Sequence, residues 1–166
     1  GSTWEAKSDH PAVHLSWFDA QAMAEFTGFR LPTEAEWEFA ARGGVKGKRL
    51  PWGNELVPAS GHRHNVWQGD FPNTNTGEDG FIGTCPADHF PPNAYGFHNL
   101  TGNVWEWTAS PFDASGAAGT IRGGSYLCAS DFCARFRPAA RQPQEWDFSA
   151  SHIGFRTVVR EPAGTD

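Results

Sequence analysis

Glycine and proline interrupt this chain so often that long helices and long strands are excluded over most of its length. The 166 residues include 19 Gly and 12 Pro. Glycine permits left-handed backbone and proline removes an amide donor, so each tends to end a regular element. Between them stand 8 Trp and 13 Phe, which bury large apolar areas from short segments. We therefore expect a loop-rich α+β fold in a single domain, residues 1–166, with a loose tail at 161–166.

Two short helices are predicted near the start. Ser16 with an acid three residues later resembles a helix N-cap, and Gly28 offers a stop. Thr33 begins a second capping box, and Gly43 ends that helix. Turn sequences between isolated aromatic residues fill the stretch from residue 50 to about residue 107. Short strands are expected at residues 121–127, 134–137 and 153–159.

The charge and the apolar runs exclude two classes of partner, and the cysteine count indicates the redox compartment. The net charge is -6 and no basic run is longer than residues 46–49, so we expect no nucleic-acid partner. No apolar run approaches membrane-spanning length, so we expect no membrane partner. Three cysteines, an odd number, do not make a secreted disulfide framework and favour a reducing compartment.

Cys128 and Cys133 are the only place where two thiols stand close in the sequence. A separation of five residues points them apart on a regular helix and to opposite faces on a regular strand, so an irregular loop would have to bring them together. Gly123 and Gly124 supply flexible backbone just before the pair. Two converging thiolates can form a disulfide or hold a soft ion such as Cu(I), and the spacing leaves both open.

Two oxygen-rich loops are candidates for Ca²⁺. Asn65 and Asp79 bracket one glycine-rich loop, and Asn99 and Glu106 bracket another. Side-chain oxygens and backbone carbonyls in such loops can surround a hard cation. The spacing matches no EF-hand loop, and ordinary Asx turns and surface acids explain the same residues.

The order of several segments resembles the sulfatase-modifying-factor family, from about His10 to Val159. The segments include Pro-Trp-Gly-Asn at 51–54, Asn-Val-Trp-Gln-Gly at 65–69, Gly-Asn-Val-Trp-Glu-Trp at 102–107, Arg-Gly-Gly-Ser at 122–125 and Gly-Phe-Arg at 154–156, together with 31–44 and 75–81. The resemblance implies an irregular, C-type-lectin-like fold with little regular secondary structure.

The cysteine pair is similar to that of the bacterial copper-dependent formylglycine-generating enzymes within this family. The resemblance implies an oxidase that uses O₂ to convert the cysteine of a sulfatase Cys-x-Pro-x-Arg motif to Cα-formylglycine. The alternative is a C-type-lectin-like ligand-binding module on the same scaffold, without this activity. The cysteines favour the enzyme, while altered neighbours favour the module.

The resemblance also implies roles for individual residues. Cys128 and Cys133 correspond to a redox-active pair that binds Cu(I), with Ser125 and Trp105 as walls of the active site. His152 stands where well-studied members have Asn, and either a substrate pocket or ordinary packing accounts for it. Two structural Ca²⁺ sites are implied: one from Asn65, Asp79 and the carbonyls of Val66 and Phe81, the other from Asn99, Glu106 and the carbonyls of Gly102 and Val104.

Departures from the family pattern refine these expectations. Ala129 and Phe132 replace a His and a Tyr that often flank the cysteines, so polar contacts near the pair are lost and either substrate recognition or turnover is expected to differ. Family disulfide positions are occupied by Ala24 and Thr157, which agrees with a bacterial cytoplasmic protein. A family segment that precedes this region and forms part of the peptide groove is expected to be absent from this chain.

Overall fold

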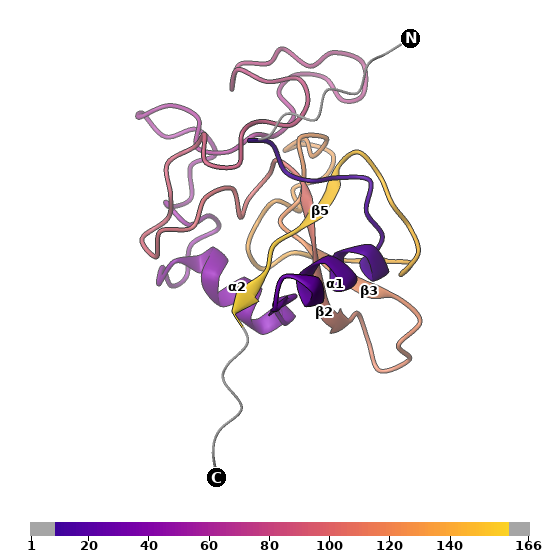
Figure 1. The fold of residues 1–166 in the computed structure, drawn as a ribbon. Helices are drawn as coiled ribbons and strands as arrows, with labels where there is room; N and C mark the ends of the chain where they lie inside the picture. The colour runs from indigo at the N-terminus through magenta and orange to yellow at the C-terminus, as the bar shows by residue number, and fades with distance from the viewer. Residues whose placement is uncertain (1–8, 160–166) are drawn as a thin grey trace.

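The computed structural model describes residues 9–159, which form two short helices, a four-stranded sheet and a two-stranded sheet joined by long loops (Figure 1). The expected loose tail at 161–166 falls outside these residues. The elements in chain order are α1 (Trp17–Phe26), β1 (Phe29–Arg30), α2 (Glu34–Arg42), β2 (Trp105–Pro111), β3 (Gly119–Arg122), β4 (Arg141–Gln144), β5 (Ile153–Phe155) and β6 (Val158–Val159). This arrangement confirms the predicted loop-rich α+β class.

Both helices begin where their capping boxes predict. The Ser16 hydroxyl accepts the N–H of Asp19 at 3.2 Å, and the Thr33 hydroxyl accepts that of Glu36 at the same distance. Each acid in turn accepts a hydrogen bond from the backbone of its N-cap residue, which satisfies amides that have no partner inside the helix. Gly43 ends α2 in the left-handed region, with φ 55.

The inner face of α1 is narrower than its apolar sequence suggests. Ala20 and Ala24 are fully buried against the main core, whereas Met23 and Phe26 are exposed. The small alanines allow the helix to lie close to the sheet, and the larger apolar residues point away from it. In α2, Trp37 and Ala41 face inward and contact Leu100.

The central strand of the large sheet, β2, was not predicted. Sheet order is β4-β3-β2-β5; β2 pairs antiparallel with β3 and parallel with β5. Residues 105–108 are all buried, so the strand lacks the alternation of polar and apolar side chains that marks a half-exposed strand. The preceding Gly-Asn sequence instead suggested a turn.

Three strand predictions need correction. The strand expected at 121–127 ends at Arg122, because Gly123 and Gly124 adopt φ 95 and 71. The segment 134–137, expected to be a strand, contains a turn. Its backbone packs tightly against Gly124, because a Cβ atom added to Gly124 would lie 2.7 Å from the Cα atom of Phe136. Pairing with β3 is made by β4 instead. The stretch 153–159 is divided between β5 and β6, which belong to different sheets.

Asparagine side chains satisfy much of the backbone in the middle loops, as the turn chemistry predicts. Asn93 Oδ1 accepts the N–H groups of Tyr95 and Phe97 at 3.0 and 3.2 Å. Asn103, with φ 63, accepts the N–H of Cys85 at 3.0 Å and donates to its carbonyl at 3.1 Å. Buried polar backbone groups must be paired, and here side-chain amides replace a sheet ladder.

A buried arginine ties α2 to the sheet. Arg122 on β3 is 1% exposed, and its guanidinium pairs with Glu34 at 2.9 Å and with Glu38. The main core lies between α1 and the sheet and comprises Ala20, Ala24, Leu31, Leu50, Val66, Trp105, Trp107, Ile121, Cys128, Phe136 and Ile153. Cys128 is therefore part of the core itself.

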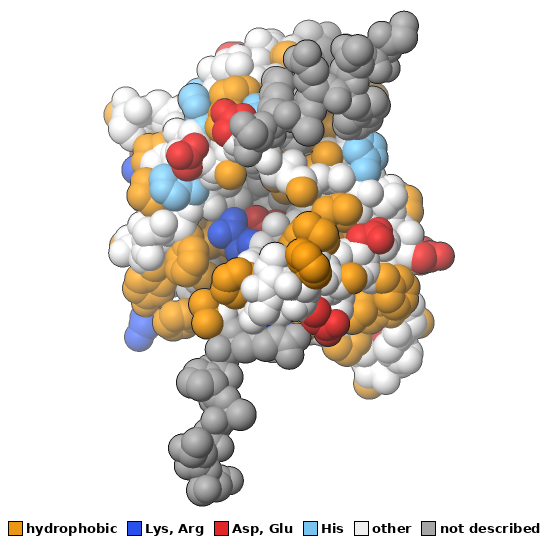
Figure 2. Space-filling view, in the orientation of Figure 1, with side chains coloured by type: hydrophobic (Ala, Val, Ile, Leu, Met, Phe, Trp, Pro, Cys, Tyr) orange, Lys and Arg blue, Asp and Glu red, His pale blue; other side chains and the backbone are white. Residues whose placement is uncertain are grey.

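The helices found within residues 9–159 are too short or too polar to cross a bilayer. The face shown in Figure 2 carries scattered Lys and Arg side chains among apolar and polar ones.

Candidate functional site

The two cysteines singled out from the sequence meet in the structure. Their Sγ atoms lie 3.3 Å apart, and both thiols are free. Cys128 is buried at 3% exposure, whereas Cys133 is partly exposed. The pair therefore has one sulfur fixed in the core and one that a ligand can reach.

An irregular loop brings the sulfurs together, as predicted. Cys128 donates its N–H to the carbonyl of Ser125 at 2.9 Å, and Cys133 donates its N–H to the carbonyl of Ala129 at 2.8 Å. The N–H of Trp67 donates to the carbonyl of Cys128 at 3.2 Å, which fixes the loop to the 65–69 segment. These bonds form a turn in place of a helix or strand.

The close contact between the two sulfurs makes one thiol more acidic and the other less acidic. Hydrogen bonding with Cys128 lowers the pKa of Cys133 to about 6. The same contact, together with burial, raises the pKa of Cys128 well above its usual range. The outer sulfur is thus the more acidic of the two, and it gains thiolate character, which is the nucleophilic and metal-binding form of cysteine.

Ser125 interacts with the inner cysteine, Trp105 belongs to the same core cluster, and His152 is bonded to Trp105 through its backbone. Ser125 is fully buried, and its hydroxyl interacts with the sulfur of Cys128. Trp105 is packed in the same core cluster as Cys128. The N–H of Trp105 donates to the carbonyl of His152 at 2.8 Å. Burial, and then the charge of His14, lower the pKa of His152.

An aromatic wall beside the cysteines was missed by the sequence analysis. The ring of Phe132 stacks on Phe71, with centroids 4.7 Å apart, and Phe71 meets Trp67 edge to face at 5.1 Å. Phe132 is 72% exposed. Its position next to Cys133 was visible in the sequence, but no pattern indicates the contact with Phe71, which is far away along the chain.

The first loop proposed for Ca²⁺ contains a buried carboxylate with no basic partner. Asp79 is 7% exposed, and within the described chain no Lys, Arg or His nitrogen lies within 4 Å of it. Its two oxygens accept the N–H groups of Val66 and Phe81, each at 3.0 Å. The buried Oδ1 of Asn65 has no hydrogen-bond partner. Asp79 also accepts a hydrogen bond from the side-chain amide of Gln68 at 2.8 Å, so its charge is hydrogen-bonded but not neutralised. A carboxylate of this kind beside an orphaned acceptor fits a bound cation.

The second loop fits a cation less well, because its carboxylate is already compensated. Glu106 accepts hydrogen bonds from Arg156 at 2.6 and 2.7 Å and from the indole of Trp37 at 2.6 Å. Asn99 Oδ1 is buried without a partner, and it lines a cavity of about 350 Å³ together with Glu106 and Val104. Gly102, the fourth implied contributor, packs its Cα against the carbonyl of Asn65, which joins the two loops.

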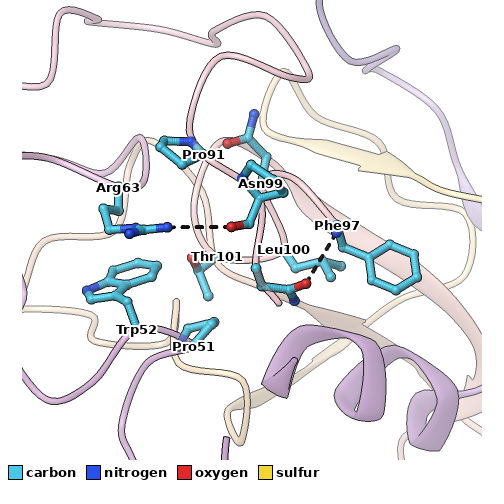
Figure 3. A pocket seen from close by; sticks show the side chains of 10 residues that line it. Pro51, Trp52, Arg63, Pro91, Phe97, Asn99, Leu100 and Thr101 are labelled. Atoms are coloured by element: carbon cyan, nitrogen blue, oxygen red, sulfur yellow. Dashed lines mark hydrogen bonds between the residues drawn. The ribbon is translucent and has the colours of Figure 1, made fainter. Parts of the chain in front are cut away.

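No cluster of three or more His, Cys, Asp and Glu side chains suited to a metal occurs within residues 9–159. A smaller cavity of about 30 Å³ lies between Trp52, Arg63 and Asn99 (Figure 3). Arg63 lies 5.8 Å over the Trp52 ring and donates to the carbonyl of Pro92 at 3.5 Å. This space suits a single buried water, so it is a packing feature rather than a ligand site.

Cys85 is separate from the reactive pair. It is fully buried, and desolvation raises the pKa of its thiol to about 11. Its backbone bonds to Asn103 fix the middle loops.

Known proteins resemble this chain in both sequence and fold. Formylglycine-generating enzyme from Thermomonospora curvata is 49% identical over 96% of this chain and 58% of its own length. The Bos taurus protein named inactive C-alpha-formylglycine-generating enzyme 2 is 47% identical over 94% of this chain and 52% of its own. The chain spans about half the length of the curated relatives it matches.

The solved structure of PvdO from Pseudomonas aeruginosa shares the fold, with a TM-score of 0.76 over 93% of this chain and 63% of that one at 24% identity. The family model of the sulfatase-modifying factor enzyme 1-like domain matches residues 1–161. The chain therefore belongs to the sulfatase-modifying factor enzyme 1-like domain family.

Proposed function

We propose that this chain is the cysteine-bearing part of a formylglycine-generating enzyme, which oxidises the cysteine of a sulfatase-type Cys-x-Pro-x-Arg segment to Cα-formylglycine. The observation that carries the proposal is the 3.3 Å contact between Cys128 and Cys133. It supplies a reactive thiolate at the surface and a second sulfur behind it. Relatives named for this activity are 42–49% identical over most of this chain.

Cu(I) is the cofactor that this donor set fits best. Two sulfur ligands, with no third His, Cys, Asp or Glu side chain grouped with them within residues 9–159, suit low-coordinate Cu(I) better than four-coordinate Zn²⁺ or oxygen-ligated Mg²⁺. Cys128 would hold the ion from the core side and Cys133 from the open side. Copper would supply the activation of O₂, while Ser125 and Trp105 limit the access of water to the buried sulfur.

The overall reaction sets a further requirement. Replacing the C–S bond of a cysteine by a C=O bond, with sulfur leaving as H₂S, releases two electrons and two protons. Reduction of O₂ to water takes up four of each. Two electrons must therefore come from an external reductant, such as a thiol. The free thiols of the chain favour a reducing compartment such as the bacterial cytoplasm, where thiol reductants are present.

Ca²⁺ is the proposed structural ion of the first oxygen-rich loop. Asp79 and Asn65 would bind through their side chains, and Val66 and Phe81 through their carbonyls, as hard oxygen ligands. The second loop, with Asn99, Gly102, Val104 and Glu106, is the weaker candidate because Arg156 already neutralises its carboxylate. Bound ions would stabilise loops that have little secondary structure of their own.

The alternative is a binding module that kept the scaffold without the activity. A relative named as inactive is 47% identical to this chain, so overall identity does not separate the two functions. Peptide oxidation by the cysteine pair would separate them. A module of this kind would bind a ligand without consuming O₂.

The test is to incubate the chain with Cu(I), dithiothreitol, O₂ and a peptide containing Cys-Thr-Pro-Ser-Arg, and to determine the peptide mass. Conversion of the thiol to an aldehyde supports the enzyme. An unchanged peptide mass, in a sample whose copper binding has been verified, would reject oxidase activity for this chain and favour the module.

A further inference from the structure

A separate cavity lies beside the cysteine turn. It measures about 300 Å³, and Ser130 and Asp131 of that turn form part of its wall, whereas neither member of the reactive cysteine pair does. Two histidines, His62 and His64, also line it. Two imidazoles on one cavity, outside the reactive pair, are available to a ligand of their own.

The backbone brings both imidazoles to the same cavity. The residue between them, Arg63, lines a different and smaller cavity and lies 5.8 Å over the Trp52 ring (Figure 3). This alternation is that of extended backbone, in which side chains two residues apart share one side at a spacing of about 7 Å. Rings on such a segment can approach until two nitrogens are about 4 Å apart, which is the separation across a metal ion that forms two opposite bonds of about 2 Å.

Both histidines carry buried nitrogens that have no hydrogen-bond partner in the described chain. Neither ring nitrogen of His64 is paired, although the side chain is fully buried. The Nδ1 atom of His62 is buried and unpaired as well. Trp52 and Phe136 hold the His64 ring edge to face, each with its centroid 5.0 Å away. Unpaired buried nitrogens are unfavourable, so these rings favour a ligand that bonds to them.

The lining of the cavity favours a cation over an anion. Glu78 and Asp131 line it, and no Lys or Arg side chain of the described chain does so. Burial, and then the charge of His62, lower the pKa of His64 to about 3, so this ring is neutral and has a lone pair to share. Neutral imidazole nitrogen is a common metal ligand. The indole N–H of Trp67 on the same cavity is also unpaired, but it can only donate, and it suits a water molecule.

We propose that His62 and His64 form a second Cu(I) site, separate from the cysteine pair. No third His, Cys, Asp or Glu side chain joins them in a cluster within residues 9–159, which leaves four-coordinate Zn²⁺ incomplete. Cu(I), by contrast, is stable with two ligands in line. The carboxylates of Glu78 and Asp131 lower the cost of placing a positive charge here. The competing occupant is water, which would pair the same nitrogens.

The double variant Cys128→Ser/Cys133→Ser isolates the histidine site for measurement. Neutral imidazoles hold Cu(I) less tightly than thiolates do, so the competitor is ferrozine, a weak Cu(I) chelator, in anaerobic buffer that contains ascorbate and no thiol. We expect one bound Cu(I) in the double variant and two in the parent chain. A strong chelator should remove the ion from the histidines and leave the ion of the cysteine pair in place.

Glutamine variants identify the ligands. Added to the double variant, His64→Gln and His62→Gln should each weaken Cu(I) binding at least tenfold, because one remaining imidazole cannot complete the site. The ring of His62 is only partly buried, so His62→Gln keeps the test valid if His64→Gln does not fold. The matched control is His89→Ala, which removes an exposed imidazole elsewhere and should retain the ion. X-ray absorption at the copper edge should show two nitrogen ligands in the double variant.

Two results would overturn the proposal. A double variant that binds no Cu(I) would show that the cavity holds only water, and binding that persists in both glutamine variants would place the ion elsewhere. The assay contains neither peptide nor O₂, so its outcome is independent of oxidase activity. A chain that binds Cu(I) at the histidines and leaves the peptide unoxidised would keep this site and reject the proposed function.

Discussion

Removal of the inner thiol should make the outer one an ordinary cysteine. The pKa of Cys133 is lowered from 9.0 to about 6 by hydrogen bonding with Cys128. At pH 7 these two values correspond to about 90% and about 1% thiolate. In Cys128→Ala the donor is lost, so the midpoint of Cys133 alkylation should move up by as much as three pH units.

The midpoint is a better observable than the rate at one pH. A less basic thiolate is also a weaker nucleophile, and with a Brønsted coefficient of about 0.4–0.5 the intrinsic loss is roughly twentyfold over this shift. This loss of nucleophilicity offsets most of the gain in thiolate fraction. The alkylation rates of the parent and of Cys128→Ala would then differ by only about fourfold at pH 7. Iodoacetamide labelling across pH 4–10, followed by peptide mass analysis, therefore gives the clearer answer.

Cys128→Ser is the matched variant. Its hydroxyl can still donate to the Cys133 sulfur, so its midpoint should lie between those of the parent and Cys128→Ala. Cys85 provides an internal reference, because it is fully buried with a raised pKa and should stay unlabelled in the folded chain. An identical midpoint in the parent and Cys128→Ala would refute the shared-proton description of the pair.

The remaining predictions concern ions, copper, redox state and capping. EDTA should lower the melting temperature and added Ca²⁺ should restore it, with most of this response lost in Asp79→Asn; an unchanged melting curve on chelation would rule out a structural ion. Cys128→Ser and Cys133→Ser should each abolish tight Cu(I) binding in competition with a chelator while the circular dichroism spectrum stays the same; tight binding by either variant would contradict a two-sulfur site. Because all three thiols are free, spectra with and without reductant should overlay, and a loss of structure on reduction would reveal a structural disulfide. Thr33→Ala should lower the free energy of unfolding by about 1 kcal/mol in urea titrations, since the capping box is lost; a change near zero would show that tertiary contacts alone hold α2.

The sequence predicted the parts of the fold that have local causes. Ser16 and Thr33 mark helix starts because their side chains bond to amides only three residues away. The glycines after Arg122 were recognised as flexible backbone, yet the strand before them was extended too far. Strand β4 was missed because its sequence, Arg-Gln-Pro-Gln, has no apolar periodicity and is tolerated only at a sheet edge, where a proline needs no ladder bond.

The candidate site was predicted in composition but not in arrangement. The cysteine pair and the two oxygen-rich loops were candidates from the residues themselves, and the family resemblance assigned their roles. The unequal exposure of the sulfurs, the burial of Asp79 with no basic side chain beside it in the described chain, and the compensation of Glu106 by Arg156 depend on contacts between residues distant in sequence. The 20° stack of Phe71 on Phe132 is of the same kind, and no local pattern encodes it.

The asymmetry of the cysteine loop has a consequence for how such a scaffold can diverge. Ser130, Asp131 and Phe132 are exposed, and Cys133 is only partly buried, whereas Cys128 is packed among core residues. Substitutions of Ser130, Asp131 and Phe132 would change the surface beside Cys133 with little effect on folding, because these three side chains are exposed. Loss or change of the proposed activity by substitution in this turn would therefore cost little stability, and new specificities can arise there while the fold is inherited unchanged.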